Sequence, residues 1–228
     1  MMLTKTRGII FKFIRYRESS IIATVFTEQL GIKSYLVNSV RTRKPTYSIS
    51  FFQPLTLLEM VVYNKENVNL NRVSEIRCEN QFRSIPFNHN KSAIALFLSE
   101  MMYKVIKHES HPEDIFRFVH DSVLSLDHLE KGFENFHLQF LLKLTRYLGF
   151  YPESGIEINS QLFQERNSSP SEIDALLNNS YEENLGGLSN HQRIQLLDQI
   201  IDFYRLHVEN LGEINSYRIL REVLHSNQ

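Results

Sequence analysis

The spacing of the apolar residues changes near residue 85, and this change limits the folds that the chain can adopt. Before it, β-branched and aromatic residues gather in five short runs, over residues 8–16, 19–27, 32–37, 54–63 and 68–76. After it, apolar residues recur every three or four positions. A period of two is typical of strands and a period of 3.6 of helices. The chain is therefore predicted to be α+β, with a β-domain over residues 1–82 and a helical domain over residues 83–228.

The five runs are predicted to form a small barrel. Ile9, Phe11 and Phe13 alternate with residues that point the other way, as in a strand with one buried face. Polar or glycine-containing breaks separate the runs, and no helical stripe crosses them. Five short strands within about 80 residues fit a Greek-key barrel of the oligonucleotide-binding (OB) type, and an SH3-like barrel is the structural alternative.

The helical half contains several amphipathic stripes. Stripes at helical spacing cover residues 94–105, 116–126 and 194–211, and a short last helix is expected over residues 216–224. Residues 136–148 are apolar nearly all round, which predicts a helix buried within a bundle. Capping boxes are predicted at residues 169–172 and 189–192. The polar stretches 151–168 and 180–188 are predicted to be loops.

The charge of the chain is distributed unevenly. Residues 1–80 hold 12 Lys and Arg against 6 Asp and Glu, whereas residues 149–228 hold 5 against 12, within a net charge of −1. A basic half joined to an acidic half indicates that the basic half meets a polyanion; the alternative is a solvated surface of uneven charge. No apolar run approaches the roughly 20 residues of a membrane span, so no membrane partner is expected.

Residue patterns of the common catalytic sites are missing. The chain has no Gly-rich phosphate loop and no Gly-x-Ser-x-Gly motif. Its single cysteine, Cys78, excludes an internal disulfide and a cysteine-rich zinc site, and it is expected to be structural. A metal-dependent hydrolase using His108 and His111 is a rival hypothesis that lacks a third ligand. We therefore expect neither an enzyme nor a cofactor, with His120, His128 and His137 as partly exposed helix residues.

The cations of the β-domain are the main candidate binding residues. They are interleaved with aromatic residues, and cations that track a phosphate backbone beside stacking faces are what a single-strand groove requires. Phe11 and Phe13 are expected to fill the barrel core. The predicted nucleic-acid-binding residues are Lys5, Arg7, Lys12, Arg15, Arg17, Lys33, Tyr35, Arg41, Arg43, Lys44 and Tyr47, with Tyr16 as a further stacking candidate.

The sequence resembles the RecO family of recombination mediators over nearly its whole length. The opening stretch TKTRGIIFKFIRYRESSIIATVFTEQLG is similar to the first hairpin of the family, with Phe26, Thr27, Glu28 and Gly31 at its characteristic positions. SVRTRKPTYSISFFQPLTLLEMVVY is similar to the basic loop and the strand after it. FLLKLTRYLGFYPE and NSYRILREVL resemble a leucine-glycine-aromatic helix end and the last helix. The order and spacing of these motifs carry the resemblance.

The resemblance implies an OB barrel followed by a helical domain, and a DNA-repair role in the cytoplasm beside the nucleoid. It implies binding and annealing of single- and double-stranded DNA. It also implies action with RecR, and in some lineages RecF, to load RecA onto DNA coated by single-strand-binding protein. Lys143 and Arg146 are the candidate contacts to the acidic, apolar tail of that protein. An RNA-binding accessory module and a protein adaptor remain the alternatives.

Many members of the family carry a four-cysteine zinc site after the leucine-glycine-aromatic motif. Residues 151–170 of this chain contain no cysteine, so that site is not expected here. Packing of Ile156, Ile158, Leu162 and Phe163 on the helical bundle is expected in its place.

Overall fold

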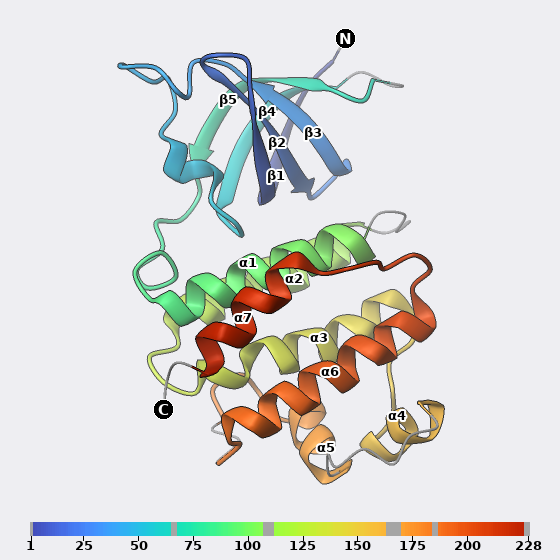
Figure 1. Ribbon diagram of the computed structural model, residues 1–228. Coiled ribbons are helices and arrows are strands. Elements are labelled where there is room, and N and C mark those ends of the chain that lie inside the picture. The colour runs from blue at the N-terminus through green and yellow to red at the C-terminus, as the bar shows by residue number, and fades with distance from the viewer. Residues whose placement is uncertain (1, 65–67, 107–111, 163–169, 184–186, 226–228) are drawn as a thin grey trace. The chain divides into compact units, whose positions relative to one another are not determined.

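The computed structural model describes residues 2–64, 68–106, 112–162, 170–183 and 187–225 (Figure 1). These residues form two compact units, and neither unit is one continuous stretch. The first contains residues 1–83 and 98–123, and the second contains residues 84–97 and 124–228. Strands occur before residue 79 and α-helices after residue 88, which confirms the predicted change of class. The domain boundary at residue 82 stays a prediction, because residues 98–123 of the helical half group with the barrel and not with the other helices.

Five strands close a barrel, as the runs of apolar residues predicted. Their order around the barrel is β1-β2-β3-β5-β4, with β3 and β5 parallel and the other neighbours antiparallel. This is the five-stranded OB-type barrel that was expected. The strands are β1 (Met2–Tyr16), β2 (Ser20–Thr27), β3 (Gly31–Val37), β4 (Leu57–Asn64) and β5 (Asn71–Cys78).

Strand β1 closes the barrel because it pairs on both sides. Its first half pairs with β4 and its second half with β2, and a bulge between Ile10 and Lys12 bends it. The bulge places Phe11 O where it accepts a hydrogen bond from Ser99 Oγ of helix α1 (His89–Val105). Gly8 lies where β1 crosses the core, and a Cβ there would lie 2.7 Å from Val25 Cγ1. The bulge and the close approach at Gly8 therefore both lie where this long strand passes from β4 to β2.

Aromatic stacking joins the barrel to the part of α2 that belongs to the first unit. Phe11 stacks on Phe26 at 5.8 Å, and Phe26 meets Phe116 of α2 (Pro112–His128) at 5.6 Å between ring centroids. Arg7 lies over the Phe116 ring and forms a two-pronged ion pair with Glu28. These contacts lie near the β2–β3 turn, so α2 packs on that end of the barrel.

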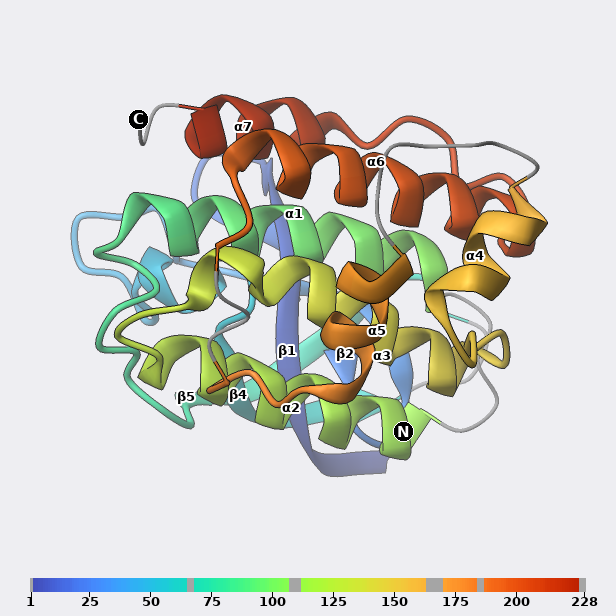
Figure 2. The same cartoon turned by 90° about the horizontal axis from the view of Figure 1, so that it is seen from below.

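The second unit is a helical bundle built around α3 (Phe136–Leu148), which has the predicted bounds. Nine of its thirteen residues are buried, which confirms the prediction that this helix lies within the bundle. Figure 2 shows α3 beside α5 (Pro170–Asn178) and α6 (Asn190–His207), with α7 (Asn215–His225) along α6. The capping box of Ser189 and Gln192 is confirmed, whereas Ser169 of the other predicted box lies outside the described residues.

Two secondary-structure predictions were wrong. Helix α4 (Gly155–Gln161) lies within the stretch predicted as a loop, because Ser154 caps it and Gly155 N donates to Asp174 Oδ1 at 2.7 Å. Helix α6 ends at His207, since Val208 is extended, so the predicted stripe continues too far. Ile158 of α4 is buried as expected, but Ile156 is 67% exposed, and Phe163 falls outside the described part of the chain.

A buried lysine organises the start of the bundle. Lys91 Nζ donates to Ser84 Oγ at 2.6 Å, and also to Asp127 O and Leu129 O at the end of α2. Asp127 Oδ1 in turn accepts from Ser84 N and Ile85 N. A cation at the carboxyl end of a helix satisfies carbonyls that have no partner within the helix. This network fixes the segment that enters α1 against the end of α2.

His137 and His120 are buried, which corrects the expectation that they are partly exposed. His137 lies in α3 with no exposed surface, and neither ring nitrogen has a hydrogen-bond partner among the described residues. Its ring meets the edge of Phe97 at 6.4 Å. Burial, with a smaller contribution from the Arg193 charge, lowers the pKa of His137 to about 3. The folded chain therefore keeps this imidazole neutral.

Replacement of His137 by leucine should remove one source of acid sensitivity. Unfolding releases an imidazole with an ordinary pKa of about 6.5, so below that pH the unfolded state binds a proton that the folded state excludes. Between pH 6 and 4, the free energy of unfolding of wild type should fall more steeply with decreasing pH than that of His137→Leu. The difference in slope should be up to about 1.4 kcal/mol per pH unit. Urea unfolding at each pH measures this difference, and parallel pH profiles would contradict it.

Among the described residues, no helix is both long enough and apolar enough to cross a membrane.

Candidate nucleic-acid interface

The tight turn between β1 and β2 holds the start of the basic loop. Arg17 occupies a left-handed conformation in this turn, with φ of +52°. Ser19 O accepts hydrogen bonds from Val40 N and Arg41 N, each at 3.0 Å. Arg41 Nη1 also donates to Arg17 O at 3.3 Å. Two cationic segments separated by more than twenty residues therefore meet at one end of the barrel.

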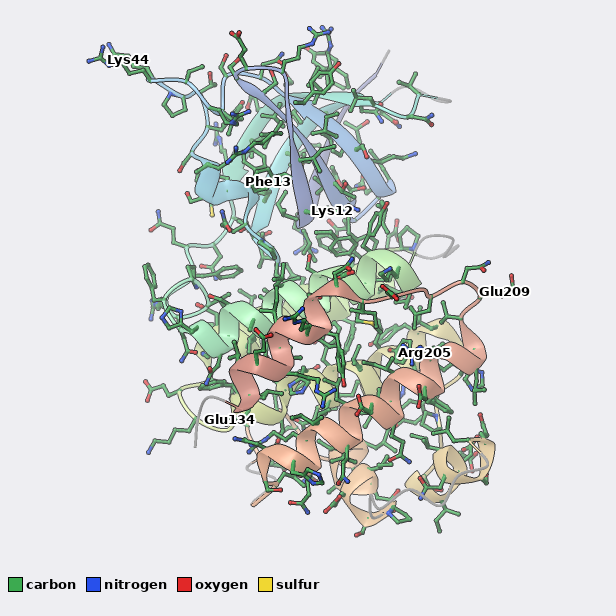
Figure 3. The ribbon with its side chains drawn as sticks, in the orientation of Figure 1. Lys12, Phe13, Lys44, Glu134, Arg205 and Glu209 are labelled. Carbon is green, nitrogen blue, oxygen red and sulfur yellow. The ribbon has the colours of Figure 1, made fainter. Side chains whose placement is uncertain are left out.

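The loop from β3 to β4 is anchored at its base and exposed beyond it. Val40 is buried in the barrel core, and Thr46 N donates to Ser39 O at 3.0 Å, which closes the loop over residues 39–46. Residues 41–46 between these anchors are exposed. Figure 3 shows Lys44 at the outer tip of this loop. We call the cations gathered at this end the rim cluster: Arg15, Arg17, Arg41, Arg43 and Lys44.

The rim cluster carries unneutralised charge. All five side chains are exposed, and none is within ion-pair distance of a carboxylate in the described parts of the chain. Between Arg15 and Lys44 the sequence has two acidic residues. Glu18 lies in the β1–β2 turn, and Glu28 lies beside the β2–β3 turn, where it pairs with Arg7. Arginine and lysine form charge-assisted hydrogen bonds with phosphate oxygens. The cluster can therefore bind a polyanion without first breaking an internal ion pair.

The other predicted cations of the barrel lie elsewhere. Lys5 and Arg15 are ten residues apart on β1, roughly 30 Å at 3.3 Å per residue. Arg7 is paired with Glu28 at 2.6 Å, and this pair raises the pKa of Arg7 and lowers that of Glu28. Lys12 Nζ lies 3.6 Å from the centre of the Tyr103 ring. Lys33 is half-buried, opposite Val25 and close to the β2–β3 turn. A DNA contact for these four stays a prediction.

The aromatic candidates differ in exposure. Tyr35 is only 1% exposed in the barrel core, so its ring offers no face to a base, and the stacking role predicted for it needs correction. Tyr35 and Val37 are two residues apart on β3, so both side chains point into the barrel core. Tyr47 is half-buried against the core, and the Arg17 guanidinium lies 5.2 Å from the centre of the Tyr16 ring. Phe13 packs against the barrel core, as expected. Phe11 is buried outside that cluster, against Phe26 on the side of Phe116, which corrects the expectation that it fills the barrel core.

One cation that is well placed to contact a polyanion, Arg72, was not predicted from the sequence. Arg72 is the second residue of β5, is exposed, and is paired with Leu36 of β3 and Tyr63 of β4. Its pairing with the end of β3 places it at the barrel end from which the basic loop departs. The stretch NRVSEI does not alternate, since Val73 and Ile76 are three residues apart, so only the strand register and strand order place Arg72 outward and beside β3.

The two candidate contacts on α3 have different environments. Lys143 is half-buried, and its Nζ donates to Asn179 O at 2.6 Å, just beyond α5, and lies 4.6 Å from the Tyr181 ring centre. Desolvation lowers the pKa of Lys143. Arg146 is exposed and lies over the Tyr151 ring at 4.5 Å. Lys143 therefore has a structural role, and Arg146 is the more accessible of the two for a partner.

We expect Lys143→Met to destabilise the folded chain and Arg146→Met to leave its stability almost unchanged. The first change removes a charged donor from a partly buried carbonyl and should cost about 1–2 kcal/mol. The second removes an exposed charge whose ring contact contributes a few tenths of a kcal/mol up to about 1 kcal/mol. Denaturant unfolding of the two variants beside wild type measures both values. Equal effects would contradict the structural role of Lys143.

No metal or reactive-thiol chemistry emerges from the described residues. They contain no group of three or more His, Cys, Asp or Glu side chains arranged to hold a metal ion. His108 and His111 lie outside the described residues. A structural zinc site needs about four Cys or His ligands, and residues 151–170 contain neither type, so the zinc site of many relatives does not fit here. Burial raises the pKa of the Cys78 thiol, which disfavours its reactive thiolate form.

Comparison with known proteins gives consistent matches to both halves of the chain. The family model described as Recombination protein O N terminal matches residues 1–82, and that described as Recombination protein O C terminal matches residues 86–160. Proteins named DNA repair protein RecO from Bacteroides fragilis and Flavobacterium psychrophilum are each 33% identical over 240 residues. That of Phocaeicola vulgatus is 30% identical over 239 residues. Each alignment covers 97% of this chain and 99% of the relative.

Proposed function

Since the chain belongs to the RecO family of recombination proteins, we propose that it is a non-enzymatic mediator of DNA repair that binds single- and double-stranded DNA through the rim cluster. The observation that carries the proposal is the meeting of Arg17 and Arg41 at one barrel end, with Arg15, Arg43 and Lys44 around them. These five cations are exposed and lack carboxylate partners among the described residues. Phosphates are common to all nucleic acids, so this contact carries little sequence preference.

The mediator role follows from holding two strands on one cationic surface. Bound cations reduce the repulsion between phosphate backbones, which allows complementary strands to approach and anneal. The remaining partners in the proposal come from the family: RecR, in some lineages RecF, and the tail of single-strand-binding protein, with RecA loaded as the result. Arg146 is the accessible candidate for a carboxylate of that acidic tail. The acidic C-terminal third disfavours DNA on its own surface and leaves it for protein contacts.

Removal of three rim charges should weaken DNA binding and make it less dependent on salt. We expect wild type to show a slope of log affinity against log salt of about −3 on a single strand, and Arg41→Ala/Arg43→Ala/Lys44→Ala to lose about 2 of that slope. Fluorescence anisotropy of a labelled single-stranded oligonucleotide across a salt series measures both. The same oligonucleotide annealed to its complement tests the duplex.

Arg205→Ala/Arg218→Ala/Arg221→Ala is the matched control, because it also removes three exposed cations, here from α6 and α7 in the acidic third of the chain. Its curves should match those of wild type. A wild-type chain that fails to bind DNA at low salt would overturn the proposal and favour a protein adaptor. Tighter binding to RNA than to DNA of the same sequence would favour an RNA-binding module that contacts the 2′-hydroxyl.

A further inference from the structure

Helices α6 and α7 border a pocket of about 260 Å³ in the second unit. Four of its lining residues recur at helical spacing on α6, so they share one face of that helix. The other two come from the residue before α7 and from its first turn. The lining residues are Asp198, Ile201, Asp202, Arg205, Ile214 and Tyr217. Small-molecule sites usually measure about 300–1,000 Å³, so this pocket suits a single side chain better than a whole metabolite.

The pocket combines apolar walls with a half-buried carboxylate. Ile201 and Ile214 are at most 8% exposed. Asp198 Oδ1 accepts a hydrogen bond from the Tyr217 hydroxyl. Within the described parts of the chain, no ion pair joins Asp198 to a cation. An ionised carboxylate has about four acceptor positions, so Asp198 keeps both its charge and its capacity to accept further hydrogen bonds.

Two arginines lie beside the pocket, and one of them is already paired. Arg205 Nη1 lies 2.8 Å from Asp202 Oδ1, so these two charges offset each other. The Arg221 guanidinium lies 5.5 Å from the centre of the Tyr217 ring and contributes one positive charge. That charge is set against Asp198 and against the acidic connection between the two helices.

The connection between α6 and α7 adds negative charge. Residues 208–214 contain no Lys or Arg and include Glu209 and Glu213, both of which are exposed. Figure 3 shows Arg205 on α6 and Glu209 in the connection that follows this helix. Four carboxylates and two guanidinium groups give the pocket and the connection a net negative charge. This charge complements a cationic ligand.

We propose that this pocket binds one lysine or arginine side chain from a basic segment of a partner protein. The methylene groups of that side chain lie against Ile201 and Ile214, and its charged end donates to the Asp198 carboxylate. Lysine and arginine both combine an apolar stem with a charged tip, which matches apolar walls beside a carboxylate. An acidic segment is repelled here, which separates this pocket from the surface around Arg146.

This inference rests on the proposed use of the acidic third for protein contacts and not on DNA binding by the rim cluster. It adds the chemistry of the partner and the residues that select it.

The test is a titration of the isotope-labelled chain with a short basic peptide, followed by amide NMR shifts. The probe is acetyl-Gly-Ser-Arg-Ser-Gly-amide, and the control probe has citrulline, which is uncharged, in place of arginine. The arginine probe should shift the signals of residues 198–217, whereas the citrulline probe should not. Asp198→Asn should weaken binding of the arginine probe roughly tenfold, because it removes the ionised acceptor of a charge-assisted hydrogen bond.

Two variants serve as controls for Asp198→Asn. Glu182→Gln removes an exposed carboxylate of the acidic third that lies before the start of α6, and it should leave binding of the probe unchanged. Tyr217→Phe removes the hydroxyl but keeps the carboxylate, so the probe should still bind. Denaturant unfolding first shows which variants fold as wild type does. If Asp198→Asn does not fold, Glu209→Gln/Glu213→Gln replaces it and should weaken binding about twofold to fivefold, as expected for exposed charges.

Three results would overturn this inference. The first is equal affinity of the arginine probe for wild type and for Asp198→Asn, or for the reserve variant. The second is a loss of binding in Tyr217→Phe as large as that in Asp198→Asn, which would assign the Asp198–Tyr217 contact to the packing of α7. The third is binding of spermidine but not of the peptide, which would favour a free polyamine. The oligonucleotide titrations test the rim cluster separately, so either proposal can fail without the other.

Discussion

The double pairing of β1 is the constraint on which the rest of the barrel depends. One strand of fifteen residues pairs with β4 through its first half and β2 through its second, and the bulge near Phe11 provides the bend between them. That register decides which side chains face the core and which face outward. It also ends β1 at Tyr16, so that the turn carrying Arg17 meets the loop carrying Arg41. A slip of one residue would exchange the two faces of the strand.

Cations of the same type have different roles because their surroundings differ. Arg7, Lys91 and Lys143 each have a partner at 2.6 Å: a carboxylate, a hydroxyl and a backbone carbonyl, respectively. Each of the three cations helps to fix one segment against another. The rim cations project from the end of β1, the turn after it and the basic loop, where their side chains are exposed to water and ligands. Partly buried cations stabilise a structure only with their partners in place, whereas exposed cations remain available to phosphate. Whether a cation has a partner within the fold therefore indicates its role better than the number of cations in a region does.

Helix α4 shows how the bundle is held together without a zinc site. Gly155 approaches α5 so closely that a Cβ would lie 2.4 Å from Pro170 O, and its amide donates to Asp174. Further polar contacts tie α4 to α6, between Asn159 and Gln199 and between Gln161 and His207. Ile158 adds a fully buried apolar anchor. Several ordinary contacts thus position this segment in the bundle.

The sequence alone determined that five strands precede the helices, the bounds of α3, the capping box of α6 and the gathering of positive charge in the barrel half. These are local properties, set by apolar period, capping residues and charge along the chain. Tertiary structure alone decided that Tyr35 points inward, that Arg7 is neutralised by Glu28, and that Arg72 joins Leu36 across a parallel pair. It also revealed α4 and the buried His137. Such features depend on which distant segments meet, and the closure of the barrel and the packing of the bundle determine those meetings.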